Sequence, residues 1–428
     1  MKKIPIIILF FYSLIFSQIN GNNKPQKIEF PFLFDKIFFF ELYTSGQDSN
    51  QSYFIYKVPL NRLLFEKKEN IFKAEFSVSL ELLDDNKNIV QREFDQKSAE
   101  VSNYEKTKSS NDYVEGIIPI SFSQKIKNII PTFTDLYTER VFKGKQIIIN
   151  TSDNGIFSTP IIVKNKLTEC NDSKGYEIAN FGGDIPFSEN NYDILLPVND
   201  NNIDEIFVKI ISNNDTLFSS KIDNYFEDNI DLKYCQGKIL IFKNHNSVKN
   251  KIFILENFDN NLPEGTFKIV ISNTSDFSNS VSFNKKIIWF DKPISLRNPE
   301  LAIKYLNFIE EDLVIDSMLD KDSFQYSKLL NNYWKKFDPT PNTEYNPIMN
   351  EYYERIDYSK INFMPISRTS GVKTDRGKIY IKYGKPSEIK RTSNTYGQVT
   401  EIWIYNSTNK EFVFIDKYGI GDFSLITG

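Results

Sequence analysis

A chain of 428 residues is too long for one ordinary hydrophobic core, so about two to four domains are expected. Its 37 phenylalanines and 23 tyrosines supply more apolar surface than a disordered chain carries, which excludes disorder as its main state. The 52 basic and 56 acidic residues give a formal charge of −4, so the basic surface typical of nucleic-acid-binding proteins is missing.

The first 21 residues are predicted to form a secretory signal peptide. Lys2 and Lys3 supply a positive start, and residues 4–16 (IPIIILFFYSLIF) form an apolar run that is too short to span a bilayer comfortably. Cleavage is expected between Ser17 and Gly21. The mature protein would then work in the periplasm or outside the cell, without a membrane span. An uncleaved membrane anchor is the alternative interpretation.

The cysteines and the single histidine limit the chemistry that the chain can perform. Cys170 and Cys235 could form a disulfide in an oxidising compartment, and two separate buried thiols are the alternative. His245, in the segment KNHNSVKN, is interpreted as a surface loop residue. A zinc site made of several histidines is impossible, and a Ser-His-Asp arrangement would have to use this residue. No metal and no cofactor are therefore expected.

Two antiparallel β-sandwich domains are predicted before residue 293. In the first, residues 22–152, the segment 72–82 (FKAEFSVSLEL) alternates apolar and polar residues, and DDNKN at 84–88 predicts a turn into a strand at 89–94. The second sandwich is expected over residues 153–292. The other predicted strands are residues 36–43, 53–59, 116–122 and 145–149 in the first domain, and 156–163, 192–197, 206–211, 238–242 and 265–271 in the second.

A C-terminal α+β domain is predicted over residues 293–428, with helices packed on a small antiparallel sheet. Asn298 before Pro299, and Asn346 before Pro347, each indicate a helix start. Apolar residues follow helical spacing at 302–313, 326–337 and 349–356, and we interpret these stripes as core-facing rather than as ligand-stacking surfaces. Strands are expected at residues 378–383 (KIYIKY), 401–405 (EIWIY) and 411–415 (EFVFI).

A succession of segments in this C-terminal part resembles the GWxTD domain, an export-associated bacterial module. The segments are NNYWKKFDPTP, NEYYERIDYSKINF, SGVKTDRGKIYIKYGKPSEI, EIWIYN and EFVFIDKYGIGDF, within residues 331–425. Gly371, Thr374 and Asp375 match the motif, whereas Val372 stands in the place of its tryptophan. Residues 56–90 are similar to the β-sandwich that precedes the domain in family members. The resemblance implies an envelope or secreted protein, and it brings no established activity, substrate or cofactor.

The polar segment around the motif is the main candidate site. Its residues are Gly371, Lys373, Thr374, Asp375, Arg376 and Gly377. Asp375 and Arg376 could present a carboxylate and a guanidinium to a ligand, with Glu401 or Asp416 as a second carboxylate for acid–base chemistry. The favoured alternative is structural: Thr374 and Asp375 would hold the turn into the strand at 378–383. Asp338, in the segment DPTP, is either a helix stop or part of a docking loop.

Two functions follow from these patterns. The first is a non-catalytic binding or structural module that engages another envelope protein or an extracellular polymer. The second is a hydrolase that acts through carboxylates of the C-terminal domain, which would require Asp375, Glu401 and Asp416 to converge in a water-accessible cleft. Having one histidine and no nucleophile motif favours the binding module, so enzymatic activity is not the leading expectation.

Overall fold

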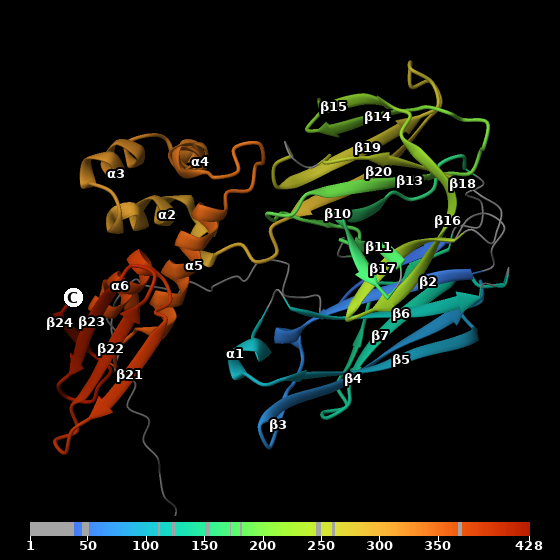
Figure 1. The fold of residues 1–428 in the computed structure, drawn as a ribbon. Helices are drawn as coiled ribbons and strands as arrows, with labels where there is room; N and C mark the ends of the chain where they lie inside the picture. Colours follow the sequence, from blue (N-terminus) through green and yellow to red (C-terminus); the bar gives the residue numbers. More distant parts are fainter. Residues whose placement is uncertain are drawn as a thin grey trace, which may run out of the picture. The chain divides into compact units, whose positions relative to one another are not determined.

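The computed structural model describes residues 38–44, 51–109, 112–121, 123, 125–149, 155–171, 173–179, 182–244, 250–258, 262–366 and 370–428. The predicted signal peptide and His245 lie outside these residues. Strands β1 to β20 come first along the chain, followed by helices α2 to α6 and the final sheet β21 to β24 (Figure 1). The prediction of a mainly β protein with a C-terminal helical region is therefore confirmed.

The first part of the chain forms two sheets that share one core. Phe76, Val78 and Leu80 on one sheet pack in the same cluster as Phe54 and Tyr56 on the other. Asp84 makes the predicted turn by accepting the backbone N–H groups of residues 86 and 88. One sheet is β1 (Phe39–Thr44), β2 (Gln51–Pro59) and β6 (Tyr113–Ser121); the other is β3 (Glu66–Lys68), β4 (Ile71–Leu83), β5 (Ile89–Val101), β7 (Asn128–Asp135), β8 (Val141–Lys143) and β9 (Ile147–Ile148), and the short helix α1 (Tyr104–Thr107) joins β5 to β6.

The middle part differs from the second sandwich that the sequence predicts. Six strands close into a barrel: β10 (Ile161–Cys170), β11 (Ser173–Ile178), β17 (Lys238–Asn244), β16 (Tyr225–Cys235), β18 (Asn250–Leu255) and β13 (Tyr192–Val198). A five-stranded sheet contains β12 (Ile185–Pro186), β20 (Ser280–Ile288), β19 (Gly265–Ser272), β14 (Ile206–Ser212) and β15 (Asp215–Ile222), and β12 runs parallel to β20.

The reason for this difference lies at the start of strand β10, where residues 161–163 are apolar and buried on both faces. Ile162 belongs to the cluster that holds Val208 and Ile269 of the five-stranded sheet. Ile161 belongs instead to the cluster that holds Ile55 and Ile241. A strand buried on both faces reads as a continuous apolar run, so its sequence does not tell which sheet covers which face.

The two cysteines lie at the ends of two barrel strands. Cys170 is the last residue of β10, and Cys235 is the last residue of β16. Their sulfur atoms form a disulfide, with the Cα atoms 6.1 Å apart. The sequence leaves open a disulfide or two separate thiols, and the structure has the disulfide. It links two strands that are not neighbours in the barrel.

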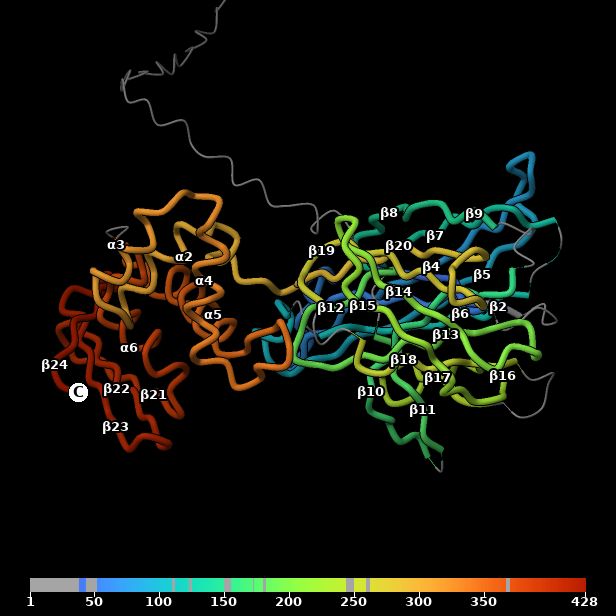
Figure 2. The backbone as a smooth tube through the Cα atoms, turned by 90° about the horizontal axis from the view of Figure 1, so that it is seen from above, coloured from blue at the N-terminus to red at the C-terminus, as the bar shows by residue number. Residues whose placement is uncertain are grey.

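The helical region begins with two asparagine caps at the predicted places. Asn298 accepts the N–H of Leu301 at the start of α2 (Pro299–Tyr305), and Asn346 accepts the N–H of Met349 at the start of α5 (Pro347–Asn362). Between them lie α3 (Asp312–Leu319) and α4 (Tyr326–Trp334), and Figure 2 follows these helices along the orange part of the chain. Of the described residues, no helix is both long enough and apolar enough to cross a bilayer.

Two predictions within the helices are wrong in detail. The apolar stripe at 302–313 is not one helix, because a 3-10 turn at Leu306–Phe308 ends α2 and changes the register. Leu313 is therefore 78% exposed rather than buried. Phe337 lies in the 3-10 turn that follows α4, outside the helical register, and is 49% exposed.

The predicted strand at residues 378–383 is wrong, because these residues belong to helix α6 (Asp375–Tyr383). The helix begins after Thr374, whose side chain accepts the N–H of Gly377, and it ends at Gly384 with φ of 77°. Ile379, Tyr380 and Tyr383 pack against the final sheet, whereas Ile381 belongs to the core of the helices. Burial on two sides makes the helix resemble an alternating strand in sequence.

The final sheet has four consecutive antiparallel strands: β21 (Glu388–Ser393), β22 (Val399–Tyr405), β23 (Lys410–Asp416) and β24 (Phe423–Thr427). The predicted strands at 401–405 and 411–415 correspond to β22 and β23. Trp403, Tyr405, Phe412 and Phe414 are buried on the face that α6 covers.

Candidate functional site

Gly371 of the motif and Gly377, two residues after it, allow helices α5 and α6 to approach each other closely. A Cβ atom on Gly371 would lie 2.1 Å from the backbone oxygen of Ser359 in α5. A Cβ atom on Gly377 would lie 2.0 Å from the backbone oxygen of Gly371. Neither backbone oxygen can move aside as a flexible side chain would, so both positions require glycine for steric reasons.

Thr374 links these two glycines through its hydroxyl group. The hydroxyl donates to the backbone oxygen of Gly371 at 2.7 Å and accepts the N–H of Gly377 at 3.1 Å. Val372, which stands in the place of the motif tryptophan, is 2% exposed and lies in the core of the helices. Lys373 between them is exposed. The motif therefore builds the junction of the two helices.

The sequence predicts that Asp375 holds a turn into a strand. This prediction is wrong, because no strand follows Asp375. It is the first residue of α6, and its carboxylate accepts the backbone N–H of Leu425 in β24 at 2.9 Å. Lys378 lies 3.6 Å away on the exposed side of the helix. Asp375 thus joins the helix to the last strand of the sheet.

Arg376 is the centre of the buried polar cluster beneath the motif. Its guanidinium donates to Glu401 and to the backbone oxygen of Gly421, each at 3.2 Å. It lies over the ring of Phe423, 3.9 Å from the centroid. Burial lowers the pKa of Arg376, and the neighbouring Glu401 opposes this shift. The group has a charge partner and aromatic contacts, so the cluster stabilises the sheet.

The two carboxylates proposed for acid–base chemistry are also engaged. Glu401 is 6% exposed and accepts from Arg376 and from the indole N–H of Trp403. Asp416 is 3% exposed and accepts three backbone N–H groups, from Tyr418, Ile420 and Gly421. Both lie near Arg376, but they do not face an open cleft as a hydrolytic pair must.

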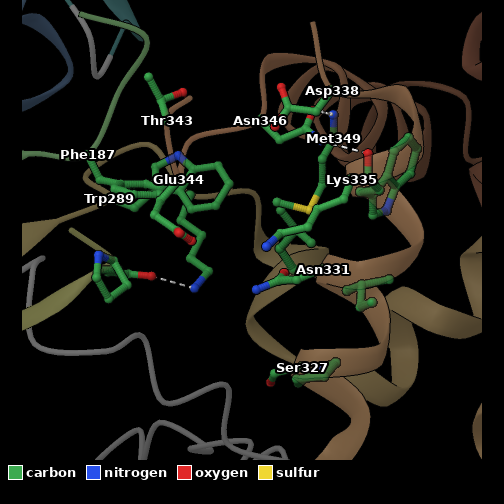
Figure 3. Close-up of a pocket in the computed structure, with 17 residues that line it drawn as sticks. Phe187, Trp289, Ser327, Asn331, Lys335, Asp338, Thr343, Glu344, Asn346 and Met349 are labelled. Carbon is green, nitrogen blue, oxygen red and sulfur yellow. Dashed lines mark hydrogen bonds and ion pairs between the residues drawn. The ribbon is translucent and has the colours of Figure 1, made fainter. Parts of the chain in front are cut away.

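Asp338 lies away from the motif, beside a cavity of about 260 Å³. Its carboxylate accepts the N–H of Thr340 at 2.8 Å, which makes the turn after α4. Figure 3 shows this cavity, with Phe187 and Trp289 on one side and Asn331 and Lys335 on the other. Asp338 is the one predicted site residue that lines it.

The inner wall of the cavity is apolar and carries two indole groups. Leu296, Leu330 and Met349 are buried there together with Trp289 and Trp334, which are 4% and 3% exposed. Phe187, Trp289 and Tyr345 form an aromatic cluster whose ring centroids are 5.3 to 5.5 Å apart. The rim is polar, with Lys335, Glu344 and the ion pair of Lys292 with Glu264 at 2.7 Å.

The indole N–H of Trp289 has no hydrogen-bond acceptor in the described part of the chain. The same holds for Trp334, although its indole lies near the Tyr353 hydroxyl and influences the pKa of that group. A buried donor without an acceptor is unfavourable by about 1 to 3 kcal/mol, so such a group calls for an explanation. Lys292 lies over the ring of Trp289, 5.5 Å from the centroid, but it does not accept the indole N–H.

A second cavity, of about 480 Å³, is lined by charged side chains that pair with one another. Lys57 lies 3.3 Å from Glu115, and Lys164 lies 2.9 Å from Glu177. Lys238 contacts both of these carboxylates. Because these groups have partners on strands of both β regions, they hold those regions together, and we do not assign a ligand to this cavity.

The sequence analysis did not identify the Trp289 cavity. It used Trp289 only as the boundary between strand and helix, and it assigned Trp334 to the helix core. Phe187, Glu264 and Asn331 come from three distant segments, so no local motif joins them. The available signal was the scarcity of tryptophan, because two of only three tryptophans line the cavity.

In the C-terminal part of the chain, capped helices precede a four-stranded antiparallel sheet, and Arg376 of α6 contacts Glu401 of that sheet. Residues 285–420 match the GWxTD domain, so this part of the chain is a GWxTD domain and the resemblance is confirmed. The match begins before Trp289 and therefore includes the residues of the helical wall of the cavity. No curated protein matches the chain.

Proposed function

We propose that this protein is a non-catalytic binding module of the bacterial envelope or exterior, exported by its N-terminal signal peptide. It engages another envelope protein or a polymer through the Trp289 cavity. The observation that carries the proposal is the cavity of about 260 Å³ itself, where the buried Trp289 and Trp334 lie beside charged residues such as Lys335 and Glu344. Apolar pockets with a few well-placed polar groups are typical ligand sites.

The organisation of the chain is part of this proposal. Two β domains, residues 22–152 and 153–292, carry the α+β domain of residues 293–428. Phe187 and Glu264, from the second region, and α4 and α5, from the third, contribute to the same cavity. A ligand bound there would contact both regions.

The engagement of the motif residues also supports binding over hydrolysis. A general acid or base must reach the substrate or a water molecule. Glu401 and Asp416 instead accept hydrogen bonds from an arginine, an indole and backbone N–H groups within the sheet. Because these contacts occupy both carboxylates, neither supports the alternative function as a hydrolase.

The experiment that tests the proposal compares two neighbouring residues on α4. Asn331 lines the cavity, whereas the adjacent Asn332 is exposed and is not among the lining residues. The mature full-length protein is immobilised and exposed to envelope extract. Asn331→Trp fills the cavity mouth and should lose the bound partner, whereas Asn332→Trp should retain it.

The outcomes separate the two halves of the proposal. Equal capture by wild type and by Asn331→Trp would show that the cavity is not the binding surface. N-terminal sequencing of the native protein tests export, because a chain that begins at Met1 would contradict removal of the signal peptide.

A further inference from the structure

One end of the final sheet carries exposed apolar side chains on three loops, and we call this group the loop tip. Strands β21 to β24 are consecutive and antiparallel, so the turn from β21 to β22 and the turn from β23 to β24 lie at the same end of the sheet. The loop tip consists of Tyr396 in the first turn, Tyr418 in the second, and Met364 and Ile366 in the loop after α5. Their exposed fractions are 88%, 81%, 56% and 75%.

Backbone contacts hold the three loops beside one another. The backbone N–H of Ile366 donates to the backbone oxygen of Ile420 at 3.2 Å, which joins the loop after α5 to the second turn. A Cβ atom on Gly419 would lie 3.6 Å from the backbone oxygen of Gly397, so the two turns are in contact as well. The four side chains therefore belong to one surface, although they come from distant parts of the sequence.

The two turns are fixed by polar side chains at their bases. Asn394 accepts the backbone N–H of Tyr396 and that of the residue two positions later. Asp416 accepts the backbone N–H of Tyr418 and two further N–H groups of the same turn. Each tyrosine is thus presented to solvent by a turn that is already ordered, and a surface ordered before binding loses little conformational entropy when it binds.

The segments that surround the loop tip carry more positive than negative charge, although the whole chain has a formal charge of −4. These segments are residues 360–366, 370–374, 392–399 and 417–422. Their exposed charged side chains are Lys360, Lys373 and Lys417, against the single carboxylate of Asp422. The charge therefore favours a partner with anionic groups.

We propose that the loop tip binds the surface of a lipid bilayer that carries anionic headgroups. Tyrosine suits the boundary between lipid and water, because its ring is apolar and its hydroxyl group remains hydrated. Met364 and Ile366 insert beside the rings, and the lysines lie among the phosphate groups. This inference goes beyond the proposed function, because none of the four side chains lines the Trp289 cavity.

A protein or a sugar polymer fits the loop tip less well than a bilayer. A protein interface is built around a contiguous, closely packed apolar core, whereas these four side chains stand on three separate loops. A fluid lipid surface requires no matching shape, because each side chain inserts by itself. A sugar polymer could stack on the tyrosine rings, but Met364 and Ile366 offer its hydroxyl groups no side-chain hydrogen-bond partner of comparable strength.

The experiment measures binding of the mature full-length protein to protein-free vesicles by sedimentation. One set of vesicles contains phosphatidylglycerol and phosphatidylethanolamine, and the other contains phosphatidylcholine alone. The wild-type protein should bind the anionic vesicles more tightly than the neutral ones. The double variant Tyr396→Ser/Tyr418→Ser should bind the anionic vesicles about tenfold more weakly, because two rings no longer insert. Lys417→Gln should weaken binding about fivefold, and only to the anionic vesicles.

The matched control removes two apolar side chains of similar exposure from other parts of the chain. Phe94 in β5 is 75% exposed and Leu313 in α3 is 78% exposed, so Phe94→Ser/Leu313→Ser should bind vesicles as the wild type does. All the replaced side chains are exposed, so the variants should keep the wild-type melting temperature. Thermal unfolding followed by circular dichroism checks this.

Two results would overturn the inference. One is a wild-type protein that binds neither kind of vesicle, and if the tyrosine variant then also loses capture from envelope extract, the loop tip binds a protein or a polymer instead. The other is a control pair that loses as much vesicle binding as the tyrosine pair. Asn331→Trp should bind vesicles as the wild type does. The vesicles contain no partner protein, so failure of the proposed function at the cavity would leave this result unchanged.

Discussion

The two polar sites of the GWxTD domain differ in whether their polar groups have partners. Around Arg376, the guanidinium and the carboxylates of Glu401 and Asp416 all have hydrogen-bond partners within the domain. In the cavity, the indole N–H of Trp289 has none among the described residues. A polar group that is fully paired stabilises the fold, whereas a buried donor without a partner is unfavourable for it. The named motif of this domain thus belongs to the scaffold, and the binding site that we propose lies elsewhere.

The largest expected effect is the loss of the Arg376 guanidinium. Arg376→Ala would leave Glu401 buried without its closer, buried charge partner, and breaking such a pair lowers the free energy of unfolding by about 3 to 5 kcal/mol. Urea denaturation of the mature chain, followed by circular dichroism, measures the change. Arg391→Ala is the matched control, because Arg391 is 63% exposed and 3.7 Å from the same carboxylate. Equal effects of the two variants would contradict the central role of Arg376.

A smaller loss is expected when the close approach of α5 and α6 is disturbed. Gly377→Ala places a methyl group 2.0 Å from the backbone oxygen of Gly371, so the helices must separate. Overpacking of this kind lowers the free energy of unfolding by about 1 to 3 kcal/mol. Gly397→Ala is less suitable as a steric control because of its positive φ, so Ser327→Ala on α4 serves instead. A stable Gly377→Ala protein would show that glycine at this position is not required for packing.

Features that depend on neighbouring residues could be predicted from the sequence, whereas features that join distant segments could not. The caps at Asn298 and Asn346 were predictable, because a cap depends on residues within one turn of the helix. Helix α6 was not, because its residues are buried on two sides and KIYIKY alternates like a strand. Strand β21 has no buried residue, so its hydrophobic pattern carries no signal. The cavity joins residues from distant segments, which only the tertiary structure brings together.

The hydrogen bond of Asp375 tests the assignment of the motif to the scaffold. Asp375→Ala removes the acceptor of the Leu425 N–H and should lower the free energy of unfolding by no more than about 1 to 2 kcal/mol, since the bond is exposed. Lys373→Ala, two residues away and exposed, should have almost no effect. Thermal unfolding of the two variants measures the difference. Unchanged stability together with lost partner capture would instead place Asp375 in a binding site.

The smallest expected effect is the difference in stability between two Trp→Phe variants. One indole has a hydrogen-bond partner, and the other has none among the described residues. Trp403→Phe and Trp289→Phe each remove similar volume from a buried site, but only Trp403 loses a hydrogen bond, the one to Glu401 at 3.3 Å. Trp289→Phe removes a donor that has no acceptor in the described structure, which relieves an unfavourable burial. Trp289→Phe should therefore lower the free energy of unfolding by about 0.5 to 1.5 kcal/mol less than Trp403→Phe. Urea denaturation followed by circular dichroism measures both variants without relying on tryptophan emission. If Trp289→Phe proves the more destabilising of the two, the Trp289 N–H has a structural partner, and the difference between the scaffold and the cavity disappears.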